Sequence, residues 1–346
     1  MAPKMALPDP KSLDQVAAPS GIVWPGGKKF AFTIIDDTDM VVGDTEPQAL
    51  DRVRRVYDLL LECGLKTTKT SWITSKEQAG GWSISLENQD YLKWIMDLRS
   101  QRAEIAIHGT ANSSSKRAET IRALDFYFDV MGKYPRIHTN HVGNLDNLYW
   151  YEDRLTGLIS SGYKAFNRLK RGQQARSLGH QEGSEYFWGD ICRERISYVR
   201  NFTFQDINTL RNDPWMPYHS PHHPFVREWF SASDGIDRRQ FVQLISERNQ
   251  DRLLEEGGAC IVYTHLAFGF SSKGQIDPTF AALIRRLSRL PGYFAPVSDV
   301  LDFLKTRRAG AGDIPPSHLS QLQMRWLRDR LLPKWRRASN GATVAP

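Results

Sequence analysis

Apolar runs alternate with amphipathic stretches along most of this chain. Residues 30–35 are mostly apolar and predict a buried strand, and the helical spacing of apolar residues over 48–63 predicts a helix that Gly64 ends. The same alternation predicts further strands at 67–74, 104–108, 135–139, 164–167, 196–204, 259–264 and 293–296, and helices at 88–100, 117–131, 148–161, 238–256, 278–290 and 298–306. Strands that alternate with helices predict a parallel sheet.

A closed or nearly closed barrel is favoured over an open, doubly wound sheet. No glycine-rich dinucleotide fingerprint follows the first strand. Polar residues instead stand at the C-terminal ends of several strands, and in α/β barrels that rim holds the active site. Around this domain, residues 1–24 predict a loosely held lead-in and residues 307–346 a basic, amphipathic C-terminal extension.

Residues 170–236 interrupt the alternation and predict an irregular insertion. They are rich in Trp, Tyr, His, Pro and Asn, and long insertions in a regular scaffold are often binding loops. Aromatic faces stack on sugars, so this composition suits a glycan pocket that includes Trp188, Arg200, Tyr218 and His219. The alternative is an insertion that packs a small core of its own.

Charge and cysteine content argue against a nucleic-acid-binding protein and against a disulfide-rich one. The formal net charge of +7 is carried by residues 305–346, while residues 1–304 are formally neutral, so no nucleic-acid partner is expected. Three scattered cysteines do not make a disulfide framework or a zinc knuckle. The N-terminus lacks an apolar signal region, and no apolar run is long enough to span a membrane, so we expect a cytoplasmic protein.

The C-terminal extension leaves two interpretations open. Apolar residues from Leu319 to Trp335 recur near helical spacing and are interleaved with arginine and lysine. Such a helix can lie on an anionic membrane surface. It can equally dock on the barrel and leave a solvated basic edge.

Candidate catalytic chemistry gathers at the strand ends. Asp36 and Asp37 end the first strand, and adjacent residues on an extended backbone point to opposite sides, so the two carboxylates have different roles. Histidines follow later strands, and a parallel barrel would bring them to the same rim: His108, His138, His141 and His265. Carboxylates and imidazoles together are the usual ligands of a catalytic zinc or similar divalent ion.

These segments resemble the NodB-type polysaccharide deacetylases (carbohydrate esterase family 4), metal-dependent enzymes on a distorted or incomplete (β/α) barrel. The likeness covers residues 25–306. The family's first motif, Phe-Asp-Asp-Gly, is similar to Ile-Asp-Asp-Thr at 35–38, which implies Asp36 as general base and Asp37 as metal ligand. The second, His-x-x-x-His, is similar to the segment that begins at His108, which implies His108 as a metal ligand. Its second histidine position holds Asn112, a weaker candidate ligand.

The remaining motifs depart further from the family. The stretch 139–143 lacks the arginine of the third motif, so Arg200 is a candidate replacement, and His138 or His141 is a candidate for the missing metal ligand. The last motif, Leu-x-His, resembles the strand that leads to His265 and implies His265 as general acid. No fourth motif is identified.

The resemblance implies removal of an N-acetyl group from an amino sugar or glycan, with a role in cell-surface polysaccharide biosynthesis. The implied cofactor is a divalent metal ion, with zinc the first choice and cobalt, nickel or manganese as alternatives. Two other functions stay open. One is hydrolysis of another C–N bond, such as a formamide, on the same scaffold, and the other is non-catalytic glycan binding with degraded motifs.

Overall fold

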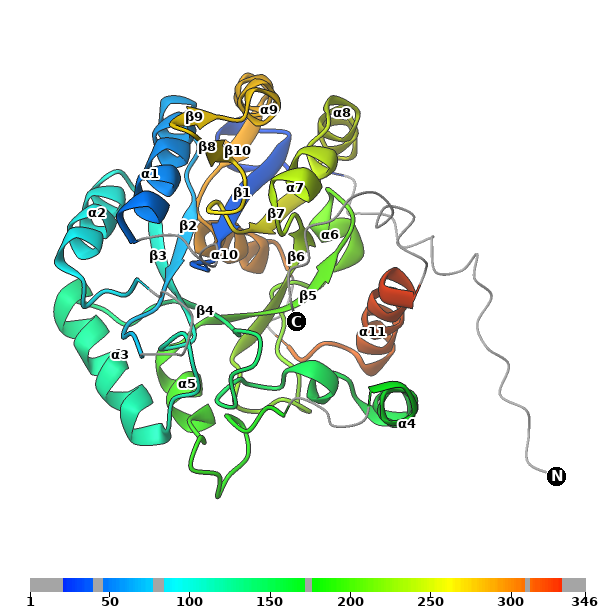
Figure 1. Ribbon diagram of the computed structural model, residues 1–346. Coiled ribbons are helices and arrows are strands. Elements are labelled where there is room, and N and C mark those ends of the chain that lie inside the picture. The colour runs from blue at the N-terminus through cyan, green and yellow to red at the C-terminus, as the bar shows by residue number, and fades with distance from the viewer. Residues whose placement is uncertain (1–20, 40–45, 77–83, 172–175, 309–311, 332–346) are drawn as a thin grey trace.

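The strand–helix alternation closes into a barrel of parallel strands (Figure 1). The computed structural model describes residues 21–39, 46–76, 84–171, 176–308 and 312–331. The ring consists, in order, of β1 (Phe30–Asp36), β2 (Thr68–Ser71), β3 (Glu104–His108), β4 (Ile137–Thr139), β5 (Tyr198–Phe204), β6 (Glu228–Asp234) and β7 (Ala259–Thr264). Pairing of β1 with β7, from Ala31↔Ala259 to Asp36↔Thr264, closes it. The predicted (β/α) barrel is therefore confirmed.

Helices surround the ring in Figure 1. They are α1 (Glu46–Glu62), α2 (Gln89–Ser100), α3 (Arg117–Met131), α4 (Gly157–Arg171), α5 (Gly189–Arg195), α6 (Thr209–Asn212), α7 (Arg238–Leu244), α8 (Glu247–Glu256) and α9 (Pro278–Ser288). Short elements complete the list: the 3-10 turns at Pro25–Gly27 and Tyr151–Arg154, the hairpin β8 (Ser271–Ser272) and β9 (Gln275–Ile276), and β10 (Gly292–Phe294), which pairs with β1.

Helix α10 (Val297–Arg307) covers the amino ends of the strands. The backbone N–H of Val297 donates to Thr68 Oγ1 at the start of β2, and that of Ser298 donates to Glu104 Oε2 at the start of β3. Its buried Leu301 belongs to the same apolar cluster as the inward residues of the barrel, such as Ala106 on β3. The carboxyl ends of the strands thus form the other rim, as the sequence analysis expected.

The predictions differ from the structure in α4 and in β6, and each difference has a packing reason. The strand expected at 164–167 lies inside α4, because residues Ile159 and Tyr163 pack on the core at helical spacing. The sixth strand, β6, was not predicted and falls within the stretch that was expected to be irregular, 170–236. The strand predicted there at 196–204 is confirmed as β5. Ser231 and Ser233 interrupt the apolar run of β6, so the sequence does not look like a buried strand. Both serines are nevertheless buried, because their hydroxyls are hydrogen-bonded inside the protein.

Helix α11 (Pro316–Leu331) docks on the barrel beside α4. Its Leu319, Leu322 and Trp326 are buried, so the apolar face expected from the sequence lies against the protein. Residues 332–346, which include Trp335 and several of the predicted basic residues, lie outside the described residues. Among the described residues, every helix is too short or too polar to cross a membrane.

Candidate active site

Three aspartates leave the carboxyl end of β1 in alternating directions. Residues two apart on an extended chain share a side, which places Asp37 and Asp39 together at the mouth of the barrel and Asp36 on the opposite side. Asp36 and Asp37 are almost completely buried, whereas the Asp39 side chain is 21% exposed. Asp39 is therefore the carboxylate that solvent can reach.

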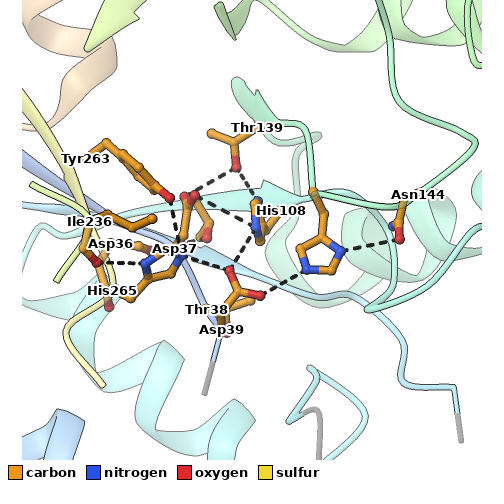
Figure 2. Close-up of polar contacts among 12 residues, drawn as sticks. Asp36, Asp37, Thr38, Asp39, His108, Thr139, Asn144, Ile236, Tyr263 and His265 are labelled. Carbon is orange, nitrogen blue, oxygen red and sulfur yellow. Dashed lines mark hydrogen bonds and ion pairs between the residues drawn. The ribbon is translucent and has the colours of Figure 1, made fainter. Parts of the chain in front are cut away.

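Asp39 is the centre of a cluster of imidazoles (Figure 2). Its Oδ2 lies 3.1 Å from Nε2 of His108 and 3.0 Å from Nε2 of His265. Its Oδ1 lies 3.0 Å from Nε2 of His141. Three rings from the ends of β3, β4 and β7 thus converge on one carboxylate.

The other nitrogen of each ring is already bonded to an oxygen that accepts. The Nδ1–H of His265 donates to the carbonyl of Ile236 at 2.8 Å, and the Nδ1–H of His141 donates to Asn144 Oδ1 at 3.3 Å. Nδ1 of His108 lies 2.7 Å from the hydroxyl oxygen of Thr139. That hydroxyl donates to Asp37 Oδ1, so it accepts from His108.

These bonds leave each neutral ring with a lone pair on Nε2 that faces a carboxylate oxygen. Two electron-rich atoms at this distance repel each other unless a proton or a metal cation lies between them. Burial alone would lower the pKa of His141 and His265, but the hydrogen bonds and charge of Asp39 raise the pKa of both. Burial would raise the pKa of Asp39, yet the imidazoles, His108 first, hold that pKa well below its usual range.

The donor set fits a divalent cation. Ligand atoms of Asp39, His108 and His141 all lie within 4.8 Å of one another, and those of Asp37, Asp39 and His265 do the same. One carboxylate with two or three imidazoles is a common set for zinc and related ions. Oxygen partners on the outer ring nitrogens, such as Thr139 and Asn144, fix the rings with Nε2 toward the ion.

Asp37 forms a buried, bidentate ion pair with Arg200 of β5. The two bonds are 3.1 Å and 2.6 Å long, and the guanidinium also lies 4.2 Å over the ring of Tyr263. Burial would raise the pKa of Asp37, but the charge of Arg200 lowers it. Asp37 Oδ2 is 3.8 Å from His108 Nε2, so residues 37 and 108 meet at the mouth, as expected.

Asp36 has a different set of partners. Its Oδ2 accepts from the Tyr57 hydroxyl and pairs with Lys69 Nζ, each at 3.1 Å. Its Oδ1 accepts the backbone N–H of Leu266 at 2.8 Å. Both oxygens are thus bonded, and the residue is 1% exposed.

The structure brings together five of the site residues named from the sequence: Asp37, His108, His141, Arg200 and His265. His138 is buried near them, and its Nε2 donates to Asn140 Oδ1. Asn112 is not directed at the imidazoles, because its side-chain amide pairs with the backbone N–H and carbonyl of Lys76.

Three expected sugar contacts lie elsewhere. Trp188 and Tyr218 are each 1% exposed, so their rings are core residues and cannot stack on a ligand. His219 pairs with Asp313 and lines a cavity with Glu228, the first residue of β6. It therefore lies at the amino end of the barrel, opposite the imidazoles.

Sequence analysis missed Asp39 and Lys69. Asp39 carried a signal, since it stands two residues beyond Asp37 and shares its side of an extended chain. Lys69 carried none, because a lysine in a short strand looks like a solvent-exposed residue until its buried partner is known.

Comparisons with known proteins give distant likenesses. No family model and no curated protein matches the chain. Among solved structures, it is similar to a candidate polysaccharide deacetylase from Mycobacterium smegmatis, with 13% identity, a TM-score of 0.48, and coverage of 85% of this chain and 96% of that one. A second candidate deacetylase, from Pseudomonas aeruginosa PAO1, is 13% identical with a TM-score of 0.47, over 82% of this chain and 93% of that one. The Puue allantoinase is 13% identical with a TM-score of 0.46, over 82% of this chain and 92% of that one. Likenesses at this identity and TM-score carry no statement about function, so the chemistry of this chain has to be inferred from its own side chains.

Proposed function

We propose that this protein is a divalent-cation-dependent amidohydrolase that removes the acetyl group from an N-acetylated amino sugar. One observation carries the proposal: three imidazole Nε2 atoms converge on Asp39 while their Nδ1 atoms are bonded to other oxygens. Asp39, His108 and His141 would hold the ion. When bound, the ion would polarise the amide carbonyl and lower the pKa of a water molecule.

The surrounding side chains supply the proton transfers. Asp37, kept ionised by Arg200 and adjacent to His108, accepts a proton from the attacking water as its oxygen bonds to the carbonyl carbon. His265, in its protonated form, then gives a proton to the amine nitrogen as the C–N bond breaks. Acetate and a free amino sugar are the products.

This assignment moves the general base from Asp36 to Asp37. The position of the two carboxylates decides between them: Asp36 faces away from the imidazoles, toward Lys69, Tyr57 and Leu266. Asp37 lies at the mouth of the barrel, with its Oδ2 3.8 Å from His108 Nε2. The arginine that the third motif lacks is supplied by Arg200, which pairs with Asp37.

The substrate class rests on the motif resemblance and on the apolar surfaces near the imidazoles. Phe268 stacks on His265 with ring centroids 4.6 Å apart and is half-buried, and Val142, next to His141, is 69% exposed. Such surfaces suit the C–H faces of a sugar ring. We further propose that the enzyme acts in the cytoplasm, on a precursor of cell-surface polysaccharide.

Acetate release from N-acetylglucosamine oligomers, measured with added zinc or cobalt, tests the function. Wild-type protein should release acetate, a chelator should stop the release, and His265→Gln should lower kcat by about 10²–10⁴-fold. His219→Ala is the control, because His219 lies at the opposite end of the barrel, and its activity should equal that of the wild type.

Two results would contradict the proposal. Cation-dependent release of formate from formamides, without release of acetate, would favour a different C–N hydrolase. Glycan binding without turnover of either substrate would favour a non-catalytic protein.

A further inference from the structure

Directly behind the mouth, an ion pair between Asp36 and Lys69 is buried. Nζ of Lys69 lies 3.1 Å from Asp36 Oδ2, and the two side chains are only 4% and 1% exposed. The hydroxyl of Tyr57, itself 1% exposed, donates to the same oxygen. Removing two charges from water costs several kcal/mol per ion, so a buried pair is weak evidence of a gain in stability and invites a functional explanation.

The second carboxylate oxygen of Asp36 binds the backbone next to His265. Asp36 Oδ1 accepts the N–H of Leu266, the next residue along the chain, at 2.8 Å. On its other side, the backbone N–H and the Nδ1–H of His265 both donate to the carbonyl of Ile236. His265 is therefore fixed from two directions, with Nε2 3.0 Å from Asp39.

We infer that Asp36 is a positioning residue: it holds Leu266 so that His265 stays aligned over the site, and Lys69 with Tyr57 fixes the Asp36 carboxylate. The inference rests on the proposed function, in which His265 donates the proton to the leaving amine. Asp36 itself transfers no proton. What the site needs from position 36 is an acceptor for the Leu266 N–H and not a negative charge.

That distinction gives a direct test. The double variant Asp36→Asn/Lys69→Met removes both charges together and keeps a side-chain oxygen that can accept from Leu266. The double variant Asp36→Ala/Lys69→Met removes the charges and the acceptor as well. Neither leaves an unpaired buried charge, which would itself disturb the fold.

Turnover of the N-acetylated sugar should separate the two variants. The asparagine variant should keep kcat within about fivefold of the wild type, whereas the alanine variant should lose about 10²-fold in kcat with little change in KM, the size of effect expected when a catalytic group is misplaced by about 1 Å. If the asparagine variant instead loses as much activity as Asp37→Asn, Asp36 acts through its charge and the inference is wrong.

A second measurement does not depend on activity. The ¹⁵N-labelled imidazole signals of His265, identified by their loss in His265→Gln, should be unchanged in the asparagine variant and shifted in the alanine variant. Unchanged signals in both variants would show that Asp36 does not position His265. If the wild type turns over no acetylated sugar, the proposed function fails, and the imidazole signals still decide the positioning role.

Discussion

At the scale of single residues, two arginine–aspartate pairs with the same bidentate geometry differ in burial. Arg200 and Asp37 are 4% and 1% exposed, whereas Arg117 and Asp190 are 37% and 47% exposed. Removing one partner of a buried pair leaves an uncompensated charge. We predict that Arg200→Met lowers the free energy of unfolding by about 3–5 kcal/mol and Arg117→Met by at most about 1 kcal/mol.

Urea denaturation of both variants measures this difference. The double variant Asp37→Asn/Arg200→Met should recover much of the loss, because it removes the stranded charge. Equal losses for Arg200→Met and Arg117→Met would show that the Asp37–Arg200 pair is not buried as described.

His223 makes the stability of the fold depend on pH. Burial lowers its pKa to about 4, and its Nε2 donates to the carbonyl of Asp153. Above pH 6.5, the ring is neutral in both the folded and the unfolded protein. Below that value the unfolded chain takes up a proton that the folded protein excludes, so stability falls by about 1.4 kcal/mol per pH unit from this residue until pH reaches about 4.

The free energy of unfolding measured from pH 7 to pH 5 checks this contribution. His223→Gln should be less stable at pH 7 but should show a shallower fall toward pH 5 than the wild type. His222→Gln, which changes an exposed neighbour, is the control and should keep the wild-type slope. An unchanged slope in His223→Gln would contradict a buried, neutral His223.

At the scale of elements, the largest buried side chain of helix α11 is Trp326. Trp326 is 2% exposed and contacts the rings of Phe202 on β5 and Tyr163 on α4. The guanidinium of buried Arg154 lies 5.1 Å from its ring. Trp326→Ala should therefore lower the free energy of unfolding by about 3–5 kcal/mol.

Met324 on the same helix provides the matched control. It is 38% exposed, so Met324→Ala should change stability by less than about 1 kcal/mol in the same urea titration. If both variants behave alike, α11 does not dock through its apolar face.

Regular elements could be predicted from the sequence where one face is apolar, and this limit explains the errors. Strand β7 has an uninterrupted apolar run and was placed correctly. Strand β6 was missed because Ser231 and Ser233 are buried by hydrogen bonds to Asp213 and Thr209, partners that only the fold supplies. The helix predicted at 148–161 instead runs from Gly157 to Arg171 and so continues past Gly162.

At the scale of the whole molecule, one end of the barrel is covered by a helix and the other end carries the candidate active site. Helix α10 covers the amino ends of the strands, and the carboxyl ends carry Asp37, Asp39 and the three imidazoles. The meeting of His108, His141 and His265 could be predicted, because parallel strands bring their ends to one rim. Arg200 was named as a candidate for the missing arginine, although its partner is Asp37. The pairing of Lys69 with Asp36 could not be predicted, since Lys69 reaches that carboxylate from another strand.

The most direct test of the account is the zinc content of the purified protein, measured after equilibrium dialysis. Wild-type protein and His219→Ala should each bind a single ion per chain with the same affinity. Asp39→Ala and His141→Ala should bind it at least about tenfold more weakly, because each removes a ligand that the fold holds in place. If the wild type binds no ion, or if Asp39→Ala binds zinc as tightly as the wild type, the cluster around Asp39 is not a metal site and the proposed hydrolase mechanism is wrong.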